Sequence, residues 1–455
     1  MTVKDFALAS PYAIPRSPAP LSSKKLLGFG LGSLGTGIFS TTPGVLLLYF
    51  LTDTLGVPAA LAGLAVFLPK AWDVIADPMM GFISDRTRSR FGRRRPYLLA
   101  GAIGMAITYV FLFTVPVFAS PITSFWYVMI LFALSATAYT VFAIPYVSMP
   151  AEMSADSNER TRILAYRMSF AMAGAIIGSA GAPGLVHEFG GGRHGYSAMS
   201  IVVGLVCAAA MLSAFLATRH VRLSDSIVPE GGIAQQLAHT LRNRNFRALA
   251  LVYIVQIVGI GTLIAAAPYY ASRILHDGEG LVSKMLLIMM GVATLSISLW
   301  NSLALRYGKK LSYYLAIVLL VASTAGMWFL SPAMPIGCLY ALLAVTGLGF
   351  GAQQVLPFAM LTDVIHADPG GAGREGITTG FWVAGEKFGL ALGPLLAGVI
   401  LQAGGFHEGL PATDAQPQSA LIAIRAAFSL VPAALLIASV WLLTRYRLPR
   451  EGQGH

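Results

Sequence analysis

The sequence predicts an all-α membrane protein with twelve transmembrane helices in two six-helix halves. Three observations support this fold class: the composition, a series of long apolar runs and an internal repeat. Of the 455 residues, 56% are hydrophobic and only 11% are charged, and the mean hydropathy is +0.70. A water-soluble domain of this size could not cover its surface with so few charges. We therefore expect lipid to surround most of the chain.

Apolar runs long enough to cross a bilayer, about 20 residues each, recur from one end of the chain to the other. No stretch between them is long enough for a soluble domain of any size. The runs lie near residues 26–51, 58–83, 97–119, 123–149, 163–186, 196–218, 246–271, 280–304, 311–331, 335–365, 376–403 and 418–444. These twelve runs predict a multi-pass protein of the cell inner membrane.

The segments outside these runs give the expected domain organisation. The first 24 residues are rich in Pro and Ser and lack the compact charged-then-apolar order of a signal peptide, so we expect a short tail and a retained first helix. The predicted parts are an N-terminal tail (1–24), a first half (25–218), a linker (219–245), a second half (246–444) and a C-terminal tail (445–455).

Basic residues give the expected orientation. The formal net charge is +11, but the cations are concentrated in the even-numbered loops, while the opposite loops hold chiefly Arg193, Arg273 and Lys284. Because cytoplasmic loops carry an excess of Lys and Arg, both termini and the linker are expected to be cytoplasmic. The charge then reports topology, and we expect no nucleic-acid partner.

An internal repeat divides the spans into two groups of six. The loop RFGRRRPYLLA at 90–100 matches RYGKKLSYYLA at 306–316, and each follows the second span of its half. This pattern is typical of the parallel repeat of major facilitator transporters. It also predicts tight glycine turns at Gly92 and Gly308. Asp85 and Arg90 are candidates for a gating loop, although the loop arginines could instead serve only as anchors at lipid headgroups.

A longer motif resembles a known family. The segment KAWDVIADPMMGFISDRTRSRFGRRRP resembles the signature of the glycoside-pentoside-hexuronide:cation symporter family, which includes the melibiose permeases. The segments NERTRILAYR, LPFAMLTDVIHAD and REGITTGFWVAGEKFGLALGPLLAG are similar to its other conserved stretches. The resemblance covers nearly the whole chain. It implies the major facilitator fold and cation-coupled symport of a sugar, glycoside or uronide by alternating access.

The resemblance also implies roles for individual residues. The two carboxylates that bind the cation in the melibiose permeases fall on Asp73 and Asp77, and a helix 4 threonine beside the cation falls on Thr140. A helix 11 lysine falls on Lys387, and a helix 5 arginine corresponds to Arg167.

Four other positions depart from the melibiose permeases. Sugar-holding carboxylates fall on Gly37 and Ala143, and a tryptophan that stacks on the galactosyl ring falls on Val147. A cation-site asparagine falls on Ala76. These departures disfavour recognition of galactosides.

The spacing of the helix 2 acids suggests how coupling could work. Asp73 and Asp77 are four residues apart and share a helix face, with Lys70 nearby on the same stripe. A carboxylate within the membrane costs at least about 2.5 kcal/mol to insert, and two together repel, which favours capture of H⁺ or Na⁺. We expect H⁺ more than Na⁺, because Ala76 offers no oxygen ligand, and no other cofactor. The alternative is a structural ion pair with Lys70 or Lys387.

Polar and aromatic residues on the spans that surround a central cavity are candidates for substrate binding. Trp382 could stack on a sugar ring, and Gln353, Gln354 and Tyr146 could bind hydroxyl groups. Each could equally be a packing residue. We expect a small-molecule substrate, a coupling cation and the bilayer as partners.

Two other functions compete with sugar symport. Lysophosphatidylcholine symporters resemble the same family, so an amphiphile is the alternative substrate. An intramembrane enzyme or sensor is disfavoured, because the sequence has no HExxH or GxSxG motif and no sensory domain. We therefore expect a protein that is not an enzyme.

Overall fold

The computed structural model describes most of the chain. The described residues are 21–154, 156–219, 240–367, 375–411 and 414–446. The expected N-terminal tail, linker and C-terminal tail lie largely outside them.

Twelve helices among the described residues are long and apolar enough to cross a membrane, which confirms the predicted fold class. The elements of the first half are α1 (Ser23–Tyr49), η1 (Phe50–Thr54), α2 (Ala59–Arg86), α3 (Arg95–Phe113), α4 (Pro121–Met153), α5 (Ser157–Ile176), η2 (Ile177–Gly181), α6 (Ala182–Glu188) and α7 (Gly192–Thr218). The elements of the second half are α9 (Arg244–Tyr269), η3 (Tyr270–Ile274), α10 (Glu279–Tyr307), α11 (Lys309–Gly326), η4 (Met327–Phe329), α12 (Ile336–His366), α13 (Glu375–Ala403), α14 (Gln418–Arg425), η5 (Ala426–Leu430) and α15 (Val431–Leu443).

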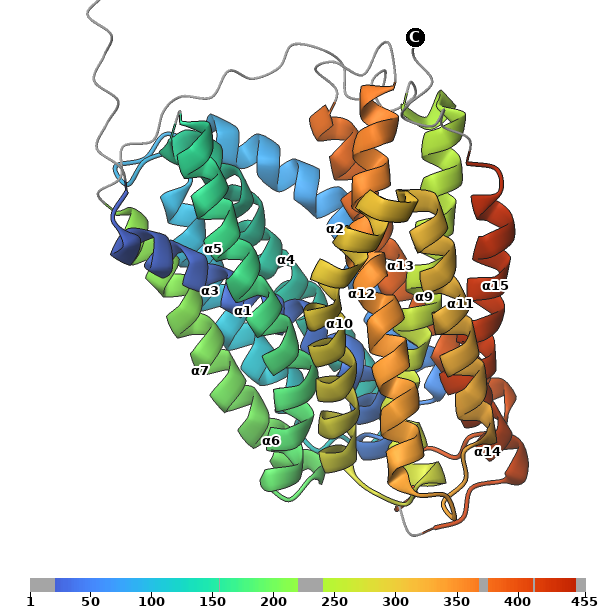
Figure 1. The fold of residues 1–455 in the computed structure, drawn as a ribbon. Coiled ribbons are helices and arrows are strands. Elements are labelled where there is room, and N and C mark those ends of the chain that lie inside the picture. The colour runs from blue at the N-terminus through green and yellow to red at the C-terminus, as the bar shows by residue number, and fades with distance from the viewer. Residues whose placement is uncertain (1–20, 155, 220–239, 368–374, 412–413, 447–455) are drawn as a thin grey trace, which may run out of the picture.

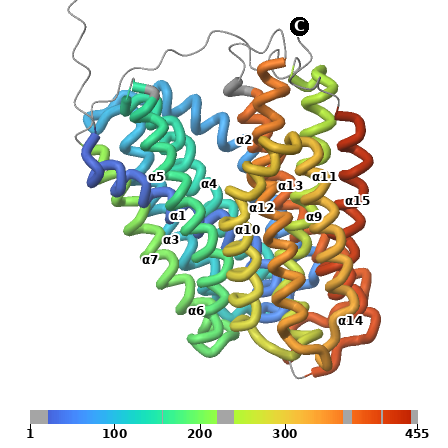
Figure 2. Tube along the Cα trace, in the orientation of Figure 1, coloured from blue at the N-terminus to red at the C-terminus, as the bar shows by residue number. Residues whose placement is uncertain are grey.

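The two halves form neighbouring helix bundles (Figure 1). The same division is visible in the tube view, where the blue-to-green helices of the first half lie beside the yellow-to-red helices of the second (Figure 2). Across the boundary α2 packs against α13, α1 against α9, and α5 with α6 against α10. The helices of the two bundles approach at the lower end and diverge toward the upper end (Figure 1).

The start of α5 shows why an apolar run can place a helix boundary wrongly. The predicted fifth span begins at residue 163, but α5 begins at Ser157. The Asp156 side chain accepts a hydrogen bond from the backbone N–H of Asn158 at 3.0 Å, which caps the helix in a polar segment. The first turns of α5 contain the charged residues Glu159, Arg160 and Arg162, so hydropathy alone does not detect them.

Glycines let α1 and α5 pack closely. A Cβ atom at Gly37 would lie 2.4 Å from the carbonyl oxygen of Ala171, and one at Gly174 would lie 2.3 Å from the carbonyl oxygen of Leu34. No larger residue fits at either position without separating the helices. Small residues commonly have this role where two membrane helices are in contact.

The two repeated loops have the same structure. Gly92 and Gly308 both adopt positive φ, 91° and 87°, as the repeat predicts. The basic residue that follows each glycine pairs with an acid near the end of the fourth helix of its half. Arg93 pairs with Glu152 of α4, and Lys309 pairs with Asp363 of α12 at 2.6 Å.

Candidate cation and substrate site

Asp77 of α2 lies at a contact between the halves. Its Oδ1 accepts a hydrogen bond from the Thr140 hydroxyl of α4 at 2.7 Å, and its Oδ2 accepts one from the Lys387 ammonium of α13. The side chains of Asp77 and Lys387 keep 21% and 25% of their exposure, so the pair is accessible on one side. The structure thus brings together three residues that the family resemblance selected.

Asp73 has a different environment, although it lies only one helical turn away. It is fully buried, and neither carboxylate oxygen has a hydrogen-bond partner among the described residues. Its ion pair is with Lys70, whose Nζ atom lies 3.8 Å from Oδ2, which is too far for a hydrogen bond. Because buried polar atoms are normally hydrogen-bonded, Asp73 is a candidate for binding a proton or a cation.

Aromatic rings surround the two lysines. The Lys70 ammonium lies 5.2 Å from the ring centroid of Phe39 and 5.6 Å from those of Phe132 and Tyr139. The Lys387 ammonium lies 5.9 Å from the Tyr139 centroid. The negative face of an aromatic ring attracts a cation at such distances. Tyr139 therefore lies within reach of both lysines.

The helices position this cluster near the middle of the bundle. In the 28-residue helix α2, Asp73 and Asp77 are the 15th and 19th residues counted from Ala59, about 21–27 Å along its axis at 1.5 Å per residue. The Trp72 indole donates a hydrogen bond to the Thr137 hydroxyl at 3.1 Å, which fixes α2 against α4. The two acids are held by packed helices rather than by a loop.

Tyr146 and Arg167 form a separate group on the first half. The Tyr146 hydroxyl donates a hydrogen bond to the backbone carbonyl of Phe29 at 2.7 Å and lies 2.9 Å from the Ser33 hydroxyl. The ring is fully buried, and the Arg167 guanidinium lies 4.8 Å from its centroid. Tyr146 thus fastens α4 to α1, and Arg167, which is half-buried, remains the member of this group that a substrate could reach.

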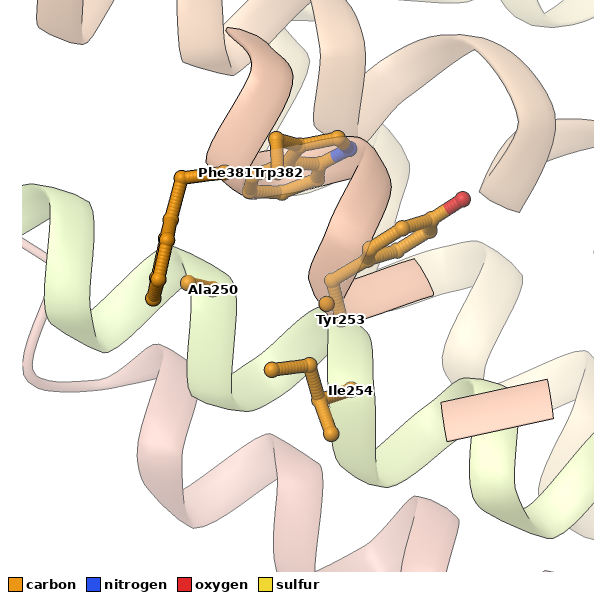
Figure 3. Close-up of a pocket in the computed structure, with 6 residues that line it drawn as sticks. Ala250, Tyr253, Ile254, Phe381 and Trp382 are labelled. Carbon is orange, nitrogen blue, oxygen red and sulfur yellow. The ribbon is translucent and has the colours of Figure 1, made fainter. Parts of the chain in front are cut away.

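Trp382 lies inside the second half and not at the boundary between the halves. Its ring is 2% exposed and stacks on Tyr253 with centroids 4.6 Å apart (Figure 3). The two rings border a small pocket between α9 and α13 that Phe381, Ile254 and Ala250 also line. In this structure Trp382 packs within the second half, which is one of the two roles that the sequence left open.

Gln353 also has a packing role. It is fully buried, and its amide donates a hydrogen bond to the Oε1 atom of Gln256 at 2.7 Å. This Oε1 atom also accepts a hydrogen bond from the Tyr313 hydroxyl at 2.6 Å. The Gln256 amide in turn donates to Ser439 at 2.9 Å. Gln354 is half-buried and lies outside this network of described residues. The structure therefore leaves Gln354 as the accessible member of the glutamine pair.

Asp85 pairs with an arginine of its own loop, and that arginine is Arg94. Asp85 accepts a hydrogen bond from Arg94 at 2.9 Å, and Arg94 also donates to Glu152 at 2.6 Å. The Arg90 guanidinium lies 4.8 Å from the ring centroid of its neighbour Phe91. The structure does not bring Arg90 and Asp85 together, and Glu152, at the last turn of α4, is the partner that sequence reasoning missed.

Sequence reasoning also missed an open stripe on α1. Ser40 is exposed and Thr36 is half-buried, while a Cβ added at Gly44 would meet nothing within 4 Å. These positions are spaced four apart and share one helix face. Most of the other residues of this helix are buried. The stripe is therefore a candidate wall of a space between the halves.

The fold and this site are those of a polytopic membrane transporter. The model of the MFS/sugar transport protein family matches residues 28–450, and the chain belongs to that family.

Curated relatives agree with this membership. An uncharacterised symporter of Synechocystis is 29% identical, with 94% of this chain and 96% of the relative covered. A putative glycoside/cation symporter of Escherichia coli is 28% identical, with 94% and 92% covered. The sodium-dependent lysophosphatidylcholine symporter 1-A of Danio rerio is 25% identical, with 93% and 85% covered.

A solved structure has the same fold. The bacterial homologue of the human lysosomal transporter Spinster, in an inward-facing and unoccupied conformation, superposes with a TM-score of 0.71 at 15% identity. The match covers 94% of this chain and 97% of that one. It supports the twelve-helix transporter fold.

Proposed function

We propose that this protein couples the movement of a cation to the uptake of a sugar, glycoside or uronide across the cell inner membrane. One observation carries the proposal. The Asp77–Lys387 ion pair joins the two halves, and Asp73, one turn away, is buried without a hydrogen bond among the described residues. An ionisable cluster within a membrane is a functional site by default, because its cost of insertion must be offset by a role.

Coupling follows from competition for the two acids. A cation at Asp73 and Asp77 reduces their attraction for Lys70 and Lys387. The Lys387 ammonium lies on α13 and Asp77 on α2, so a change in this contact alters an interaction between the halves. A cation that binds one arrangement of the halves more tightly than the other shifts the equilibrium between the two arrangements. The size of the shift is the difference between the two binding free energies. No chemical conversion of the substrate is part of this scheme.

The substrate is proposed to bind between the halves beside this cluster. Thr36 and Ser40 offer hydroxyl groups from α1, and Arg167, Lys387 and Gln354 offer donors from α5, α13 and α12. Hydroxyl and amide groups suit a sugar, and the two cations suit the carboxylate of a uronide.

A lysophospholipid is the second candidate substrate, and the zebrafish relative favours it. A zwitterionic headgroup could use the same charged cluster, but the acyl chain would need an apolar path between the helices. The apolar pocket beside Trp382 has a volume of only about 10 Å³, roughly enough for one water molecule, so it is too small to hold any part of such a chain.

The test is uptake by the purified protein in proteoliposomes. Labelled glycosides, uronides and lysophosphatidylcholine are offered with an inward H⁺ gradient, an inward Na⁺ gradient, both or neither. We expect gradient-driven accumulation of a glycoside or uronide. Accumulation of lysophosphatidylcholine alone would select the second candidate, and no accumulation of any of them would contradict the proposal.

The coupling ion is proposed to be H⁺. Na⁺ needs several oxygen ligands, whereas H⁺ needs a single carboxylate, and Ala76 between the two acids supplies no side-chain oxygen. We expect uptake that a protonophore abolishes and that persists at contaminant levels of Na⁺. Strong stimulation by Na⁺ that survives the protonophore would reverse this assignment.

A further inference from the structure

The two halves carry the same unusual turn at the end of the bundle opposite the linker. A π-helical turn ends the first helix of each half, at η1 (Phe50–Thr54) in the first and η3 (Tyr270–Ile274) in the second. The backbone N–H of the residue after each turn, Leu55 or Leu275, donates to the first carbonyl of the turn at 3.1 Å in both cases. π-turns inside α-helices are rare and frequently mark functional sites.

Equivalent residues of the two turns touch each other. Tyr49 and Tyr269 directly precede the two turns, and their rings pack edge to face with centroids 5.0 Å apart. Asp53 and Arg273 occupy the same position in their respective turns, and their side chains form an ion pair at 2.5 Å. Residues that a two-fold axis relates can contact each other only near that axis. The ion pair therefore lies where the pseudo-two-fold axis of the repeat passes through this end of the bundle.

Arg273 is the centre of a set of contacts between the halves. Its side chain is only 2% exposed, and besides Asp53 of the first half it donates to the backbone carbonyls of Leu410 and Pro411 in the second, at 2.6 and 2.8 Å. The loop that carries those carbonyls also contacts the first half, because the Gly409 N–H donates to the Thr52 carbonyl at 3.0 Å.

Neighbouring hydrogen bonds close the same end. The Thr52 and Tyr269 hydroxyls are 2.6 Å apart, and Glu408 accepts a hydrogen bond from the backbone N–H of Ala59 at 2.8 Å. Each of these contacts joins the first half to the second. Separating the halves at this end would break all of them and would leave a buried guanidinium without its carboxylate, which is costly.

We propose that Arg273 is the latch of a gate at the linker-distal end. Its ion pair with Asp53 holds this gate closed, and the ion pair breaks when the space between the halves opens to that side. The role of such opening in transport rests on the proposed function. The Asp53–Arg273 ion pair is a property of this structure, and the prediction made from it concerns access to the space between the halves rather than transport of a substrate.

The test measures that access directly. Ser40, exposed on α1, is replaced by cysteine as a reporter in a background in which Cys207 and Cys338 are alanine, and a membrane-impermeant maleimide is added from the linker-distal side. With Arg273→Gln we expect the reporter to react at least about tenfold faster, which corresponds to about 1.4 kcal/mol in the opening equilibrium. An unchanged rate in a folded variant would overturn the proposal.

Arg193 provides a matched control at the same end. Its guanidinium donates to the backbone carbonyls of Val115 and Pro116, at 3.1 and 3.3 Å, and both belong to its own half. Arg193→Gln should leave the labelling rate unchanged, and equal acceleration in both arginine variants would overturn the proposal.

Two further variants keep the test decisive if Arg273→Gln fails to fold. Asp53→Asn keeps the bonds from Arg273 to the two carbonyls and should give a smaller acceleration. Exchange of the charges in Asp53→Arg/Arg273→Asp should return the rate toward that of the parent. Because labelling needs neither substrate nor an ion gradient, a protein that fails to transport any offered sugar can still support or contradict the latch.

Discussion

Lys387 of α13 donates a hydrogen bond to Asp77 of α2, and this ion pair links the two halves of the protein in the middle part of α2. Each partner neutralises a charge that the surrounding apolar helices could not solvate. Loss of either partner leaves the other unpaired, whereas loss of both removes the charges together.

A double-mutant cycle tests this pairing. Lys387→Met and Asp77→Asn should each lower the stability of the purified protein by about 1–3 kcal/mol, below the range for a fully buried pair because both side chains are partly exposed. The double variant should regain most of the loss. Thermal unfolding in detergent measures the four proteins, and simple additivity of the two losses would contradict the pairing.

Lys70 is predicted to set the strength of cation binding. It is the ion-pair partner of Asp73, at 3.8 Å and without a hydrogen bond, so its ammonium competes with a bound cation for Asp73. In Lys70→Met the coupling cation should bind at least about threefold more tightly, since the competing positive charge is gone. Lys70→Arg should stay close to the wild type. The concentration of cation that gives half-maximal uptake is the measurement, and equal values in all three proteins would refute the prediction.

Close packing of α1 against α5 predicts opposite outcomes for two glycines of the same helix. Gly37→Ala should destabilise the protein by several kcal/mol, because the new methyl group would lie 2.4 Å from the carbonyl oxygen of Ala171. Gly44→Ala meets nothing within 4 Å and should be neutral or stabilising by about 0.5–1 kcal/mol. Unfolding temperatures compare them, and similar values would show that α1 and α5 do not pack as described.

The buried ring of Trp382 predicts a stability effect instead of a recognition effect. Trp382→Ala should lower stability by about 3–5 kcal/mol, while a variant that still folds should bind substrate with an unchanged Kd. Gln354→Ala, at the accessible glutamine, serves as the comparison and should weaken binding without loss of stability. A large loss of substrate affinity in a stable Trp382 variant would return it to the binding site.

The sequence predicted the parts of this protein that depend on a regular pattern. The twelve spans follow from hydropathy, and the turns at Gly92 and Gly308 follow from the repeated loop and are confirmed by their positive φ values. The family resemblance selected Asp77, Thr140 and Lys387, which the structure brings into contact.

Other features depend on the direction in which a side chain points, and sequence does not determine it. Trp382 and Lys387 are five residues apart, about 140° around the helix, so one faces the core of its own half and the other faces α2. To predict that Asp53 pairs with Arg273, one must know the angle between two helices that belong to different halves of the chain. The signal in the sequence was that Arg273 is one of the few cations on that side of the protein, together with Arg193 and Lys284.

The central claim is that the helix 2 acids couple a cation to the substrate, and one comparison of two assays tests it most directly. Asp73→Asn and Asp77→Asn are reconstituted with the wild type and with Asp277→Asn, a variant at an exposed acid outside the spans. Each protein is assayed for gradient-driven accumulation and for exchange of substrate across the membrane without a gradient. We expect both helix 2 variants to lose accumulation while at least one retains exchange, and Asp277→Asn to behave as the wild type. Accumulation at the wild-type level in Asp73→Asn and Asp77→Asn would contradict the account.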